Sequence, residues 1–348
     1  MNAIRCGIIG CGSILPWHAN PLQRIEGAHL VAVSDTVKER AKEAGKTYGV
    51  DAYQDYRQML KRDDLDVVHI CTISGTHGAI GLDAISAGKH VLIEKPIEIK
   101  LDRIDALIKA AHENGVKLGG VFQMRFYSST AKMVDALESG RFGKVVLAEY
   151  ENKSMRTIEY YQKDSWRGTW EFDGGGALMN QGVHGVDIIQ YLAGPVARVC
   201  ALTKTLTRPI EVEDTAAAVM EFQNGAIGVL KATTSLYPGF PSKLFIHGER
   251  GSAAIQGENI IAWQFDETLP GDDKVMEANV EVESPMGSDP KAHSDTAHEA
   301  CIRSFLESVR EDKTPSVSGE EARKSVELIL AIYHSSKTGG WVELPFEG

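Results

Sequence analysis

The sequence predicts a doubly wound α/β domain followed by an α+β domain with a largely antiparallel sheet. Short apolar segments alternate with helical segments over the first third of the chain, whereas extended segments cluster after residue 195. At 348 residues the chain exceeds the usual size of a single hydrophobic core, so two domains are expected. We place them at residues 1–124 and 125–348.

The first domain is expected to hold five short apolar strands. These are residues 4–9, 30–33, 67–71, 90–93 and 116–122. Segments with helical character lie among them, at residues 37–47, 56–61, 78–87 and 102–113. Strands and helices that alternate at this spacing indicate a parallel sheet with helices on both faces.

The pattern changes after residue 125. Helices are expected at residues 129–138, 180–191, 297–310 and 319–335, and strands at 196–205, 214–222, 226–235, 244–247 and 252–256. Turn residues such as Asn224-Gly225 join several of these strands, which favours antiparallel neighbours. The acidic stretch 264–292, with many glycines and prolines, is expected to be a loop.

Charge and cysteine usage exclude several classes of protein. The net charge of -11 argues against sequence-independent binding of nucleic acid, which needs clustered basic residues. The five cysteines show no CxxC spacing and are expected to be buried thiols in a reducing cytoplasm. We expect no signal peptide, because the N-terminus lacks a charged segment followed by a long apolar run, and no membrane span, because no apolar stretch approaches about 20 residues.

A glycine turn follows the first strand and precedes a possible helix. Gly10 and Gly12, with Ser13 and Ile14, are therefore expected to bind the pyrophosphate of a dinucleotide. The third position of this motif is Leu15 instead of glycine or alanine, which departs from the usual requirement for close packing of helix and strand.

Asp35 ends the second strand, about 25 residues beyond the glycine turn, where a carboxylate accepts the ribose hydroxyls of NAD. The same charge would repel a 2′-phosphate. Lys38 and Arg40 lie close enough to soften that repulsion, so NAD is favoured and NADP is the second choice. Asp35 could equally cap the helix that follows Val37, and both roles can coexist.

The tripeptide Glu94-Lys95-Pro96 closes the strand at residues 90–93. The carboxyl end of such a strand borders the crevice in which doubly wound sheets bind ligands, so the Lys95 ammonium is expected to reach nicotinamide and a substrate hydroxyl. Thr72 and His77, which follow the third strand, are expected to border the cofactor, together with Glu94 and Pro96.

A second constellation runs from Gly174 to Asp187. If the segment after the glycines is an α-helix, Asn180 and His184 lie four residues apart on one face, which Asp187 can share. Histidine is the side chain best suited to proton exchange near neutral pH. A single histidine near a helix start can equally be structural, and the segment alone leaves both possibilities open.

Together these motifs resemble the Gfo/Idh/MocA oxidoreductase family, and the resemblance covers nearly the whole chain. Further matching segments are Ala32-Val33-Ser34-Asp35, Ala87-Gly88-Lys89-His90-Val91, Gly140-Arg141-Phe142-Gly143-Lys144, Glu213-Asp214-Thr215 and the stretch from Ser304 to Glu321. The resemblance implies a Rossmann dinucleotide-binding domain and a domain with an open, mostly antiparallel sheet, whose outer face often forms a homodimer or homotetramer interface.

The resemblance also implies a reaction: hydride transfer between nicotinamide and a secondary alcohol of a sugar or cyclitol. Lys95 would orient or polarise the reacting oxygen, and His184 would exchange its proton. A lysine with an ordinary pKa of about 10.4 is a poor base near neutral pH, so the proton is assigned to His184.

One departure from the family bears on the substrate. Members similar to inositol dehydrogenase have aspartate four residues before the histidine, where this chain has Asn180. The form Asn-Gln-Gly-x-His looks more like members that oxidise C3 of hexosides or of nucleotide-sugar hexuronates. We therefore expect a pyranose sugar, a glucoside or a nucleotide sugar.

Three more residues are expected to contact the sugar. Trp166 could stack on a pyranose ring, and Arg167 could bind a carboxylate, a phosphate or a pair of hydroxyls. A salt bridge of Arg167 in a packed loop is the structural alternative. Arg125 follows the last strand of the first domain and is expected to point into the crevice.

The sequence leaves other functions open. The alternatives are an inositol dehydrogenase, a glycoside hydrolase that works by transient C3 oxidation, and a non-catalytic NAD-binding regulator; the presence of both Lys95 and His184 argues against the regulator. His293, His298 and Cys301 lack a further spaced ligand, so we expect a solvated helix there and no metal.

Overall fold

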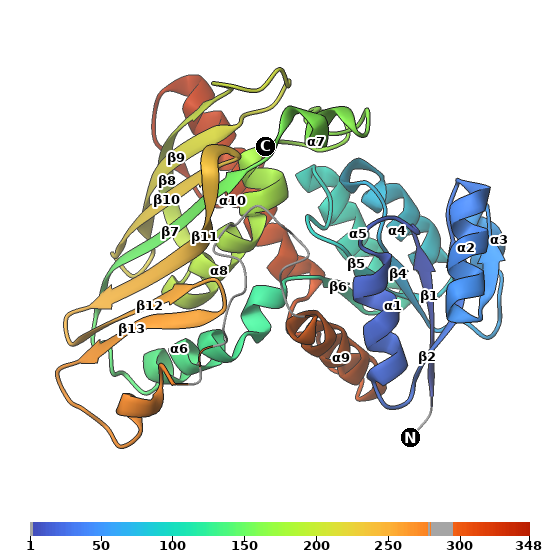
Figure 1. Ribbon diagram of the computed structural model, residues 1–348, viewed down its shortest axis with the longest axis horizontal. Coiled ribbons are helices and arrows are strands. Elements are labelled where there is room, and N and C mark those ends of the chain that lie inside the picture. The colour runs from blue at the N-terminus through green and yellow to red at the C-terminus, as the bar shows by residue number, and fades with distance from the viewer. Residues whose placement is uncertain (1–2, 278, 280–294) are drawn as a thin grey trace. The chain divides into compact units, whose positions relative to one another are not determined.

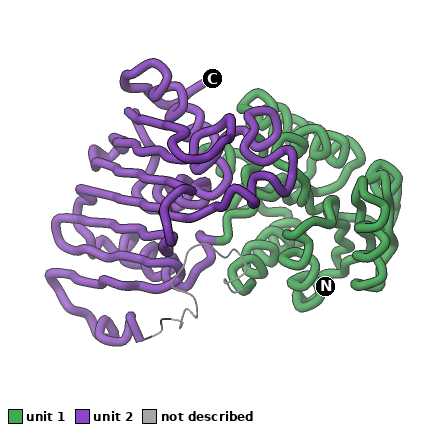
Figure 2. The backbone as a smooth tube through the Cα atoms, turned by 45° about the horizontal axis from the view of Figure 1, so that its top comes forward, with its two compact units in different colours: residues 1–123, 294–324 green, residues 124–293, 325–348 purple. Residues whose placement is uncertain are grey.

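The computed structural model describes residues 3–277, 279 and 295–348. These residues form two compact units (Figure 2), of which the first holds the described residues up to Gln123 and those from 295 to Lys324. The second unit holds the described residues of 124–277, residue 279 and 325–348. The structure thus groups residues 295–324 with the first unit, whereas the sequence division at residue 124 places them in the second domain.

The first unit contains a six-stranded parallel sheet with the order β3-β2-β1-β4-β5-β6 (Figure 1). Its strands are β1 (Ile4–Ile9), β2 (Ala28–Ser34), β3 (Asp51–Tyr53), β4 (Val67–Ile70), β5 (His90–Ile93) and β6 (Leu118–Gly120). The direction of winding reverses between β1 and β4, and ligands of such sheets bind outside the carboxyl ends of the strands at this point. The expected parallel α/β domain is confirmed.

Six helices accompany this sheet in the described part of the first unit. They are α1 (Leu15–Arg24), α2 (Lys38–Tyr48), α3 (Tyr56–Leu60), α4 (His77–Ser86), α5 (Leu101–Asn114) and α9 (Thr296–Arg310). A short 3-10 turn, η1 (Ser74–Thr76), precedes α4. Helix α1 has Pro16 in its first turn, where a proline sacrifices few main-chain hydrogen bonds, and it also contains Pro21 in its interior.

Close packing explains why α9 belongs to the first unit. A Cβ atom on Gly119 of β6 would lie 2.6 Å from the ring of Phe305, so β6 needs a glycine for α9 to approach it. Phe305 is buried, and α9 also packs against α1. These contacts join segments more than 170 residues apart, and for that reason no local pattern predicted them.

The second unit contains an eight-stranded sheet with the order β13-β12-β11-β7-β10-β9-β8-β14. Its strands are β7 (Val145–Met155), β8 (Val196–Lys204), β9 (Thr215–Phe222), β10 (Ile227–Thr233), β11 (Ser235–Gly248), β12 (Gly251–Gln256), β13 (Asn259–Phe265) and β14 (Val342–Glu343). Only β7 and β10 pair in parallel among these described strands. The expected mostly antiparallel sheet is confirmed.

Sequence analysis missed the short strands β3 and β14 and the longer strands β7 and β13. Strand β7 carries Glu149, Glu151 and Lys153 on alternate positions, a pattern typical of a half-buried strand, whereas the sequence analysis considered mainly apolar runs. Strand β13 extends to Phe265, past the start of the loop expected at 264–292, and most of that stretch lies outside the described residues.

Helices and short turns accompany the sheet of the second unit. They are α6 (Ser128–Glu138), α7 (Ile158–Gln162), α8 (Val183–Ala193) and α10 (Gly319–Thr338), with the short turns η2 (Gln123–Phe126) and η4 (Asp272–Lys274). Helix α10 begins in the first unit and ends in the second. Helix α8 packs on β7 and β11, and Ser335 of α10 accepts a hydrogen bond from the Ala201 amide of β8. Among the described residues, no helix is long and apolar enough to cross a membrane.

The packing of α9 gives a first prediction. Phe305→Ala is expected to lower the free energy of unfolding by about 3–5 kcal/mol, because it removes a buried ring and leaves a cavity under β6. Urea denaturation followed by circular dichroism measures the change. The control is Phe240→Ala, which truncates a 48% exposed ring and should cost much less. Equal effects of the two substitutions would contradict the packing of α9 in the core.

Candidate functional site

The glycine turn after β1 has the shape that a pyrophosphate-binding turn requires. Gly10 has a φ of 103°, and a Cβ atom there would lie 2.4 Å from the carbonyl oxygen of Cys71. Gly12 has open space around it, and both Gly12 and Ser13 are exposed at the start of α1. Leu15, in the third position of the motif, is buried in the first turn of α1. The turn therefore offers main-chain amides beside a helix N-terminus despite this departure.

Asp35 ties the end of β2 to the glycine turn. One carboxylate oxygen accepts the Cys11 amide hydrogen at 2.8 Å, and the other accepts the Val37 amide hydrogen at 2.8 Å. Asp35 thus holds the amide of Val37, the N-cap residue of α2, but its side chain does not cap the helix, so the capping role given as the structural alternative is absent. Each oxygen has a further lone pair, so the same carboxylate can still accept a ribose hydroxyl.

His77 joins two loops at the carboxyl edge of the parallel sheet. Its buried ring places Nδ1 2.9 Å from the Pro96 carbonyl oxygen and Nε2 3.1 Å from the Thr72 carbonyl oxygen. Burial lowers the pKa of His77, and a neutral ring donates to one of these carbonyls only. Both ring nitrogens thus face the main chain, and His77 fixes the positions of Thr72 and Pro96.

The Glu94-Lys95-Pro96 segment follows β5 directly, as expected. The Glu94 carboxylate, which sequence analysis assigned to the cofactor, is buried and turns into the first unit. Its Oε1 lies 2.9 Å from Nε2 of His18 and 3.4 Å from Nε2 of His298, and its Oε2 accepts the Lys95 amide hydrogen at 3.1 Å. The side chain of Glu94 therefore holds the main chain of the half-buried Lys95 in place.

The expectation of a solvated histidine on α9 was wrong, because His298 is 5% exposed and faces α1. Among the described residues, His18, Glu94 and His298 form a group whose possible ligand atoms lie within 4.8 Å of one another. Cys301 is buried and is not a member of this group, and His293 lies outside the described residues.

In the second unit His184 lies in the first turn of α8, but Asn180 precedes that helix. Residues Ala177–Gly182 form the π-helical turn η3 instead of the first turn of the expected α-helix. Turns of this kind often occur at functional sites. The i, i+4 relation of Asn180 and His184 thus spans a π-turn and an α-helix, so it does not place them on one face of a regular α-helix.

Glu213 explains the unusual turn. Its buried carboxylate accepts the amide hydrogens of Gly176 at 2.9 Å and Leu178 at 2.8 Å, and the hydroxyl hydrogen of Tyr333 at 2.9 Å. Burial raises the pKa of Glu213 to about 7, against the effect of these hydrogen bonds. Sequence analysis noted Glu213-Asp214-Thr215 only as part of the resemblance and gave Glu213 no role.

Arg125 forms an ion pair that sequence analysis did not expect. Its guanidinium donates to both carboxylate oxygens of Asp187, at 2.8 and 2.6 Å, and both side chains are nearly fully buried. The guanidinium also lies 4.6 Å from the centre of the Tyr191 ring. Because a bidentate pair uses the guanidinium fork, Arg125 holds α8 in place instead of presenting a free fork to a ligand.

A polar network surrounds Arg167. Its guanidinium donates to Asp164 at 3.0 Å and to the Tyr160 hydroxyl at 2.7 Å, and it lies over the rings of Tyr160 and Trp166. The salt bridge given as the structural alternative for Arg167 is therefore present. Gln181 also donates to the Tyr160 hydroxyl, at 3.2 Å, so the network reaches the π-turn.

Asp173 is a second carboxylate without a predicted role. It accepts hydrogen bonds from the Asn180 side-chain amide at 2.6 Å and from the Gly168 main-chain amide at 2.9 Å. The expected Asn180 is thus oriented by a buried acid seven residues earlier. A loop that contains three glycines separates Asp173 from Asn180, and this is why sequence spacing alone did not reveal the pair.

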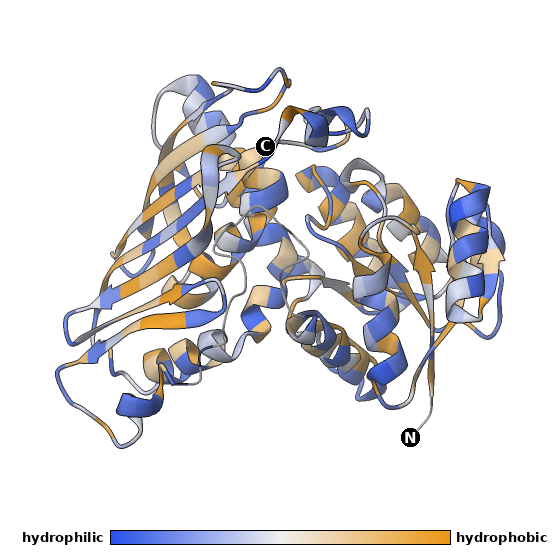
Figure 3. Cartoon of the chain, viewed as in Figure 1, coloured by the Kyte–Doolittle hydropathy of each residue, from blue (hydrophilic) through white to orange (hydrophobic). Residues whose placement is uncertain are grey.

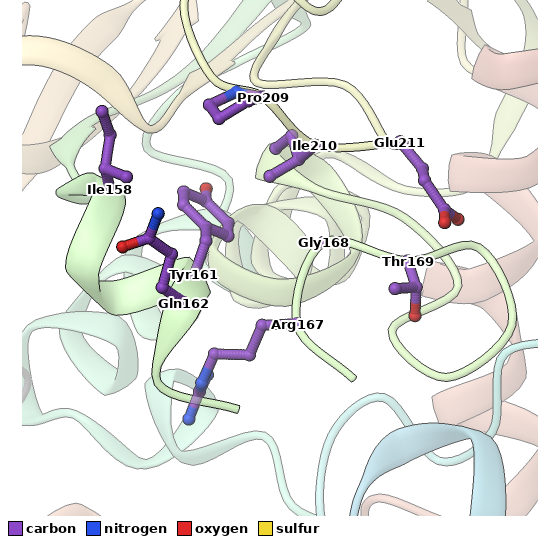
Figure 4. A pocket seen from close by; sticks show the side chains of 9 residues that line it. All are labelled: Ile158, Tyr161, Gln162, Arg167, Gly168, Thr169, Pro209, Ile210 and Glu211. Atoms are coloured by element: carbon purple, nitrogen blue, oxygen red, sulfur yellow. The ribbon is translucent and has the colours of Figure 1, made fainter. Parts of the chain in front are cut away.

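The second unit also contains a pocket of about 530 Å³ (Figure 4). Its lining comes from α7, from the loop around Arg167 and from a loop near residue 210. The lining residues are Ile158, Tyr161, Gln162, Arg167, Gly168, Thr169, Pro209, Ile210 and Glu211. Of the residues expected to contact the sugar, only Arg167 lines it.

Comparison with known families matches both parts of the chain. Residues 4–121 match the model described as "Oxidoreductase family, NAD-binding Rossmann fold", and residues 130–254 match the "GFO/IDH/MocA C-terminal domain". Myo-inositol 2-dehydrogenase of Thermotoga maritima is 25% identical, over 93% of this chain and 94% of its own length. scyllo-Inositol 2-dehydrogenase (NAD(+)) of Bacillus subtilis is 27% identical, over 99% and 97%.

A solved structure is more similar in sequence. The WlbA dehydrogenase from Bordetella pertussis, in complex with NADH and UDP-GlcNAcA, is 33% identical to this chain. The two superpose with a TM-score of 0.91 and cover 99% of each chain. The similarity therefore extends over both units.

The packing beneath His184 gives a second prediction. A Cβ atom on Gly185 would lie 1.8 Å from the ring of Tyr150, which is fully buried in β7. Gly185→Ala is expected to displace α8 and to lower the free energy of unfolding by about 1–3 kcal/mol. Thermal unfolding measures this effect. The control is Gly340→Ala, whose Cβ would meet no atom within 4 Å. Equal melting temperatures of the two variants would contradict the close approach of α8 to β7.

Proposed function

The chain belongs to the Gfo/Idh/MocA family of NAD-dependent oxidoreductases, and from this we propose that it oxidises C3 of a pyranose in a nucleotide-linked hexuronate. The observation that carries the proposal is the 33% identity, over 99% of both chains, with a dehydrogenase in complex with NADH and UDP-GlcNAcA. The inositol dehydrogenases are less similar, and Asn180 departs from the aspartate that members of that kind have.

The first unit fits the dinucleotide. The glycine turn has open space at Gly12, and Gly12, Ser13 and Ile14 are proposed to bind a pyrophosphate beside the N-terminus of α1. Asp35 is placed at the end of β2, where its carboxylate favours a ribose with free hydroxyls and disfavours a 2′-phosphate. NAD is therefore the proposed cofactor ahead of NADP.

Oxidation of an alcohol removes a hydride from carbon and a proton from oxygen. NAD, when bound, accepts the hydride. We assign the proton to His184, because imidazole can exchange a proton near neutral pH, and we assign polarisation of the hydroxyl oxygen to Lys95. Asn180, oriented by Asp173, and Trp166 with Arg167 are proposed to contact the sugar.

The assay is cofactor reduction followed by the absorbance of NADH. Purified protein would be mixed with NAD or NADP and with UDP-hexuronates, UDP-hexoses, alkyl glucosides, free hexoses and inositols. Reduction with a UDP-hexuronate supports the proposal, and analysis of the product locates the new carbonyl. Reduction with inositols alone would overturn the substrate class. Release of an aglycone without accumulation of NADH would instead indicate the hydrolase.

Substitution tests the two catalytic assignments. Lys95→Ala and His184→Ala are each expected to lower kcat by about a hundredfold or more, because each removes a group that acts on the reacting oxygen. The Kd for NADH, measured by fluorescence, is expected to change little in His184→Ala. Near-normal turnover in both variants would contradict the assignment.

We also propose that the chain self-associates through the open face of its eight-stranded sheet. Hydrophobic and hydrophilic residues alternate along strands of this sheet (Figure 3). A row through Ala218, Leu230 and Tyr150 is buried, whereas the adjacent row through Val219 and Val229 lies on the other face. On that face Leu202, Val219 and Ile227 are 66%, 45% and 53% exposed. An exposed apolar area of this kind typically marks a protein interface.

Val219→Arg tests the interface. The charge is expected to convert a homodimer or homotetramer into a smaller species, because burial of an unpaired guanidinium disfavours association. Light scattering coupled to size-exclusion chromatography measures the mass. The control is Met276→Arg, which places the same charge on an exposed apolar residue away from this sheet. A wild-type monomer at all concentrations would overturn the proposal.

We propose that the protein is cytoplasmic. All five cysteines are free thiols, and Cys6, Cys71 and Cys301 are buried among apolar side chains. Free cysteines without disulfides are typical of a reducing compartment.

A further inference from the structure

A buried cluster of three histidines and one glutamate lies beneath Lys95 in the first unit. It consists of His18 from α1, His69 from β4, Glu94 after β5 and His298 from α9. Each of the four is at most 6% exposed. Four different elements thus direct a titratable side chain to one point behind the Lys95 segment, and neither dinucleotide binding nor proton transfer as described above uses His18, His69 or His298.

The hydrogen-bond distances determine where the protons lie. Nε2 of His18 is 2.9 Å from the Glu94 carboxylate, and Nδ1 of His18 is 2.9 Å from Nδ1 of His69. Burial lowers the pKa of both histidines, so each ring is neutral and carries one N–H. His18 therefore donates from Nε2 to Glu94, and His69 donates from Nδ1 to His18. The remaining Nε2 of His69 keeps a lone pair and has no hydrogen-bond partner among the described residues.

The same proton positions disfavour a metal ion. A metal ligated by Nε2 of His18 would move the His18 proton to Nδ1 and force His69 to carry its own proton on Nε2. That buried N–H would face no acceptor among the described groups. An unsatisfied buried donor is costly, whereas the arrangement with protons alone satisfies every N–H of His18 and His69. The geometry therefore favours a hydrogen-bonded cluster.

The cluster acts on Glu94, and Glu94 acts on Lys95. Burial by itself would raise the pKa of Glu94, but hydrogen bonds from His18 and His298 outweigh it and hold that pKa well below its usual range. The ionised carboxylate uses Oε1 for the two histidines and Oε2 for the Lys95 amide hydrogen at 3.1 Å. On the other side of Lys95, the Pro96 carbonyl oxygen lies 2.9 Å from His77. The main chain of Lys95 is thus anchored at both ends.

We propose that His18 and His298 are positioning residues for Lys95, which they hold through the carboxylate of Glu94. The inference rests on the proposed function, in which the Lys95 ammonium polarises the substrate hydroxyl. A small displacement of a catalytic group lowers the rate of the chemical step more than it lowers binding. Loss of either histidine contact should therefore lower kcat and leave cofactor and substrate binding nearly unchanged.

The test compares two substitutions at one position. His298→Leu removes the donor, whereas His298→Gln keeps an N–H at the reach of Nε2. His298→Leu is expected to lower kcat about tenfold or more while KM and the Kd for NADH stay within about threefold. His298→Gln should stay within about threefold of the wild type in kcat. Ser308→Ala removes another buried hydrogen bond of α9 and should leave kcat unchanged.

Hydrogen exchange gives a readout that does not depend on turnover. The Lys95 amide donates to Glu94, so its exchange should become about tenfold faster in His298→Leu and not in His298→Gln or Ser308→Ala. Mass spectrometry of the peptide that contains Lys95 measures this. If His298→Leu fails to fold, Glu94→Gln replaces it. A glutamine side chain has a single acceptor oxygen and cannot accept from both the histidines and the Lys95 amide, so it should likewise speed exchange at Lys95.

Three results would overturn the inference. The first is unchanged exchange at Lys95 in whichever of His298→Leu and Glu94→Gln folds, and the second is an equal loss of kcat in His298→Leu and Ser308→Ala. The third is stoichiometric zinc in the purified wild-type protein that is absent from His298→Leu. Failure of the wild type to oxidise any sugar in the panel would instead contradict the proposed function. The exchange measurement would still decide whether the cluster holds Lys95.

Discussion

Burial of the parallel sheet on both faces is the constraint on which the first unit depends. Strands covered by helices on each side are apolar along their length, so polar groups that act on ligands can lie only beyond the strand ends. The turn at Gly10, Asp35, Thr72 and Glu94 follow four successive carboxyl ends, at β1, β2, β4 and β5. A chemically diverse set of side chains therefore gathers at one edge of the sheet for a topological reason.

Buried carboxylates then fix the loops at this edge and in the second unit. Glu94 holds the Lys95 amide, Asp187 holds Arg125 and Glu213 holds the π-turn before His184. A buried acid is stable only when hydrogen bonds or opposite charges compensate its lost hydration. Each of these acids consequently imposes a specific geometry on the main chain around it, which a surface acid could not do.

The same principle separates ligand contacts from structural ones. Arg125, Arg167 and His77 were all expected beside a ligand, and each already has strong partners within its own unit. Arg125 and His77 hold α8 and the Pro96 segment. Arg167 holds the loop around Trp166 and is also the residue proposed to contact the sugar. Lys95 and His184 remain the proposed catalytic pair. Glu94 holds the Lys95 main chain and Arg125 holds α8, and these contacts supply the rigidity that catalysis by orientation requires.

The sequence by itself determined the fold class, the strand that precedes Lys95, the glycine turn and the family, because these follow from local periodicity and short motifs. Only the tertiary structure decided that α9 joins the first unit, that His298 is buried beside His18 and Glu94, and that Arg125 pairs with Asp187. It also decided that a π-turn precedes α8, since the acid responsible, Glu213, lies more than 30 residues further along the chain. Contacts between distant segments depend on how elements pack, and a local sequence pattern does not specify which distant element will pack against it.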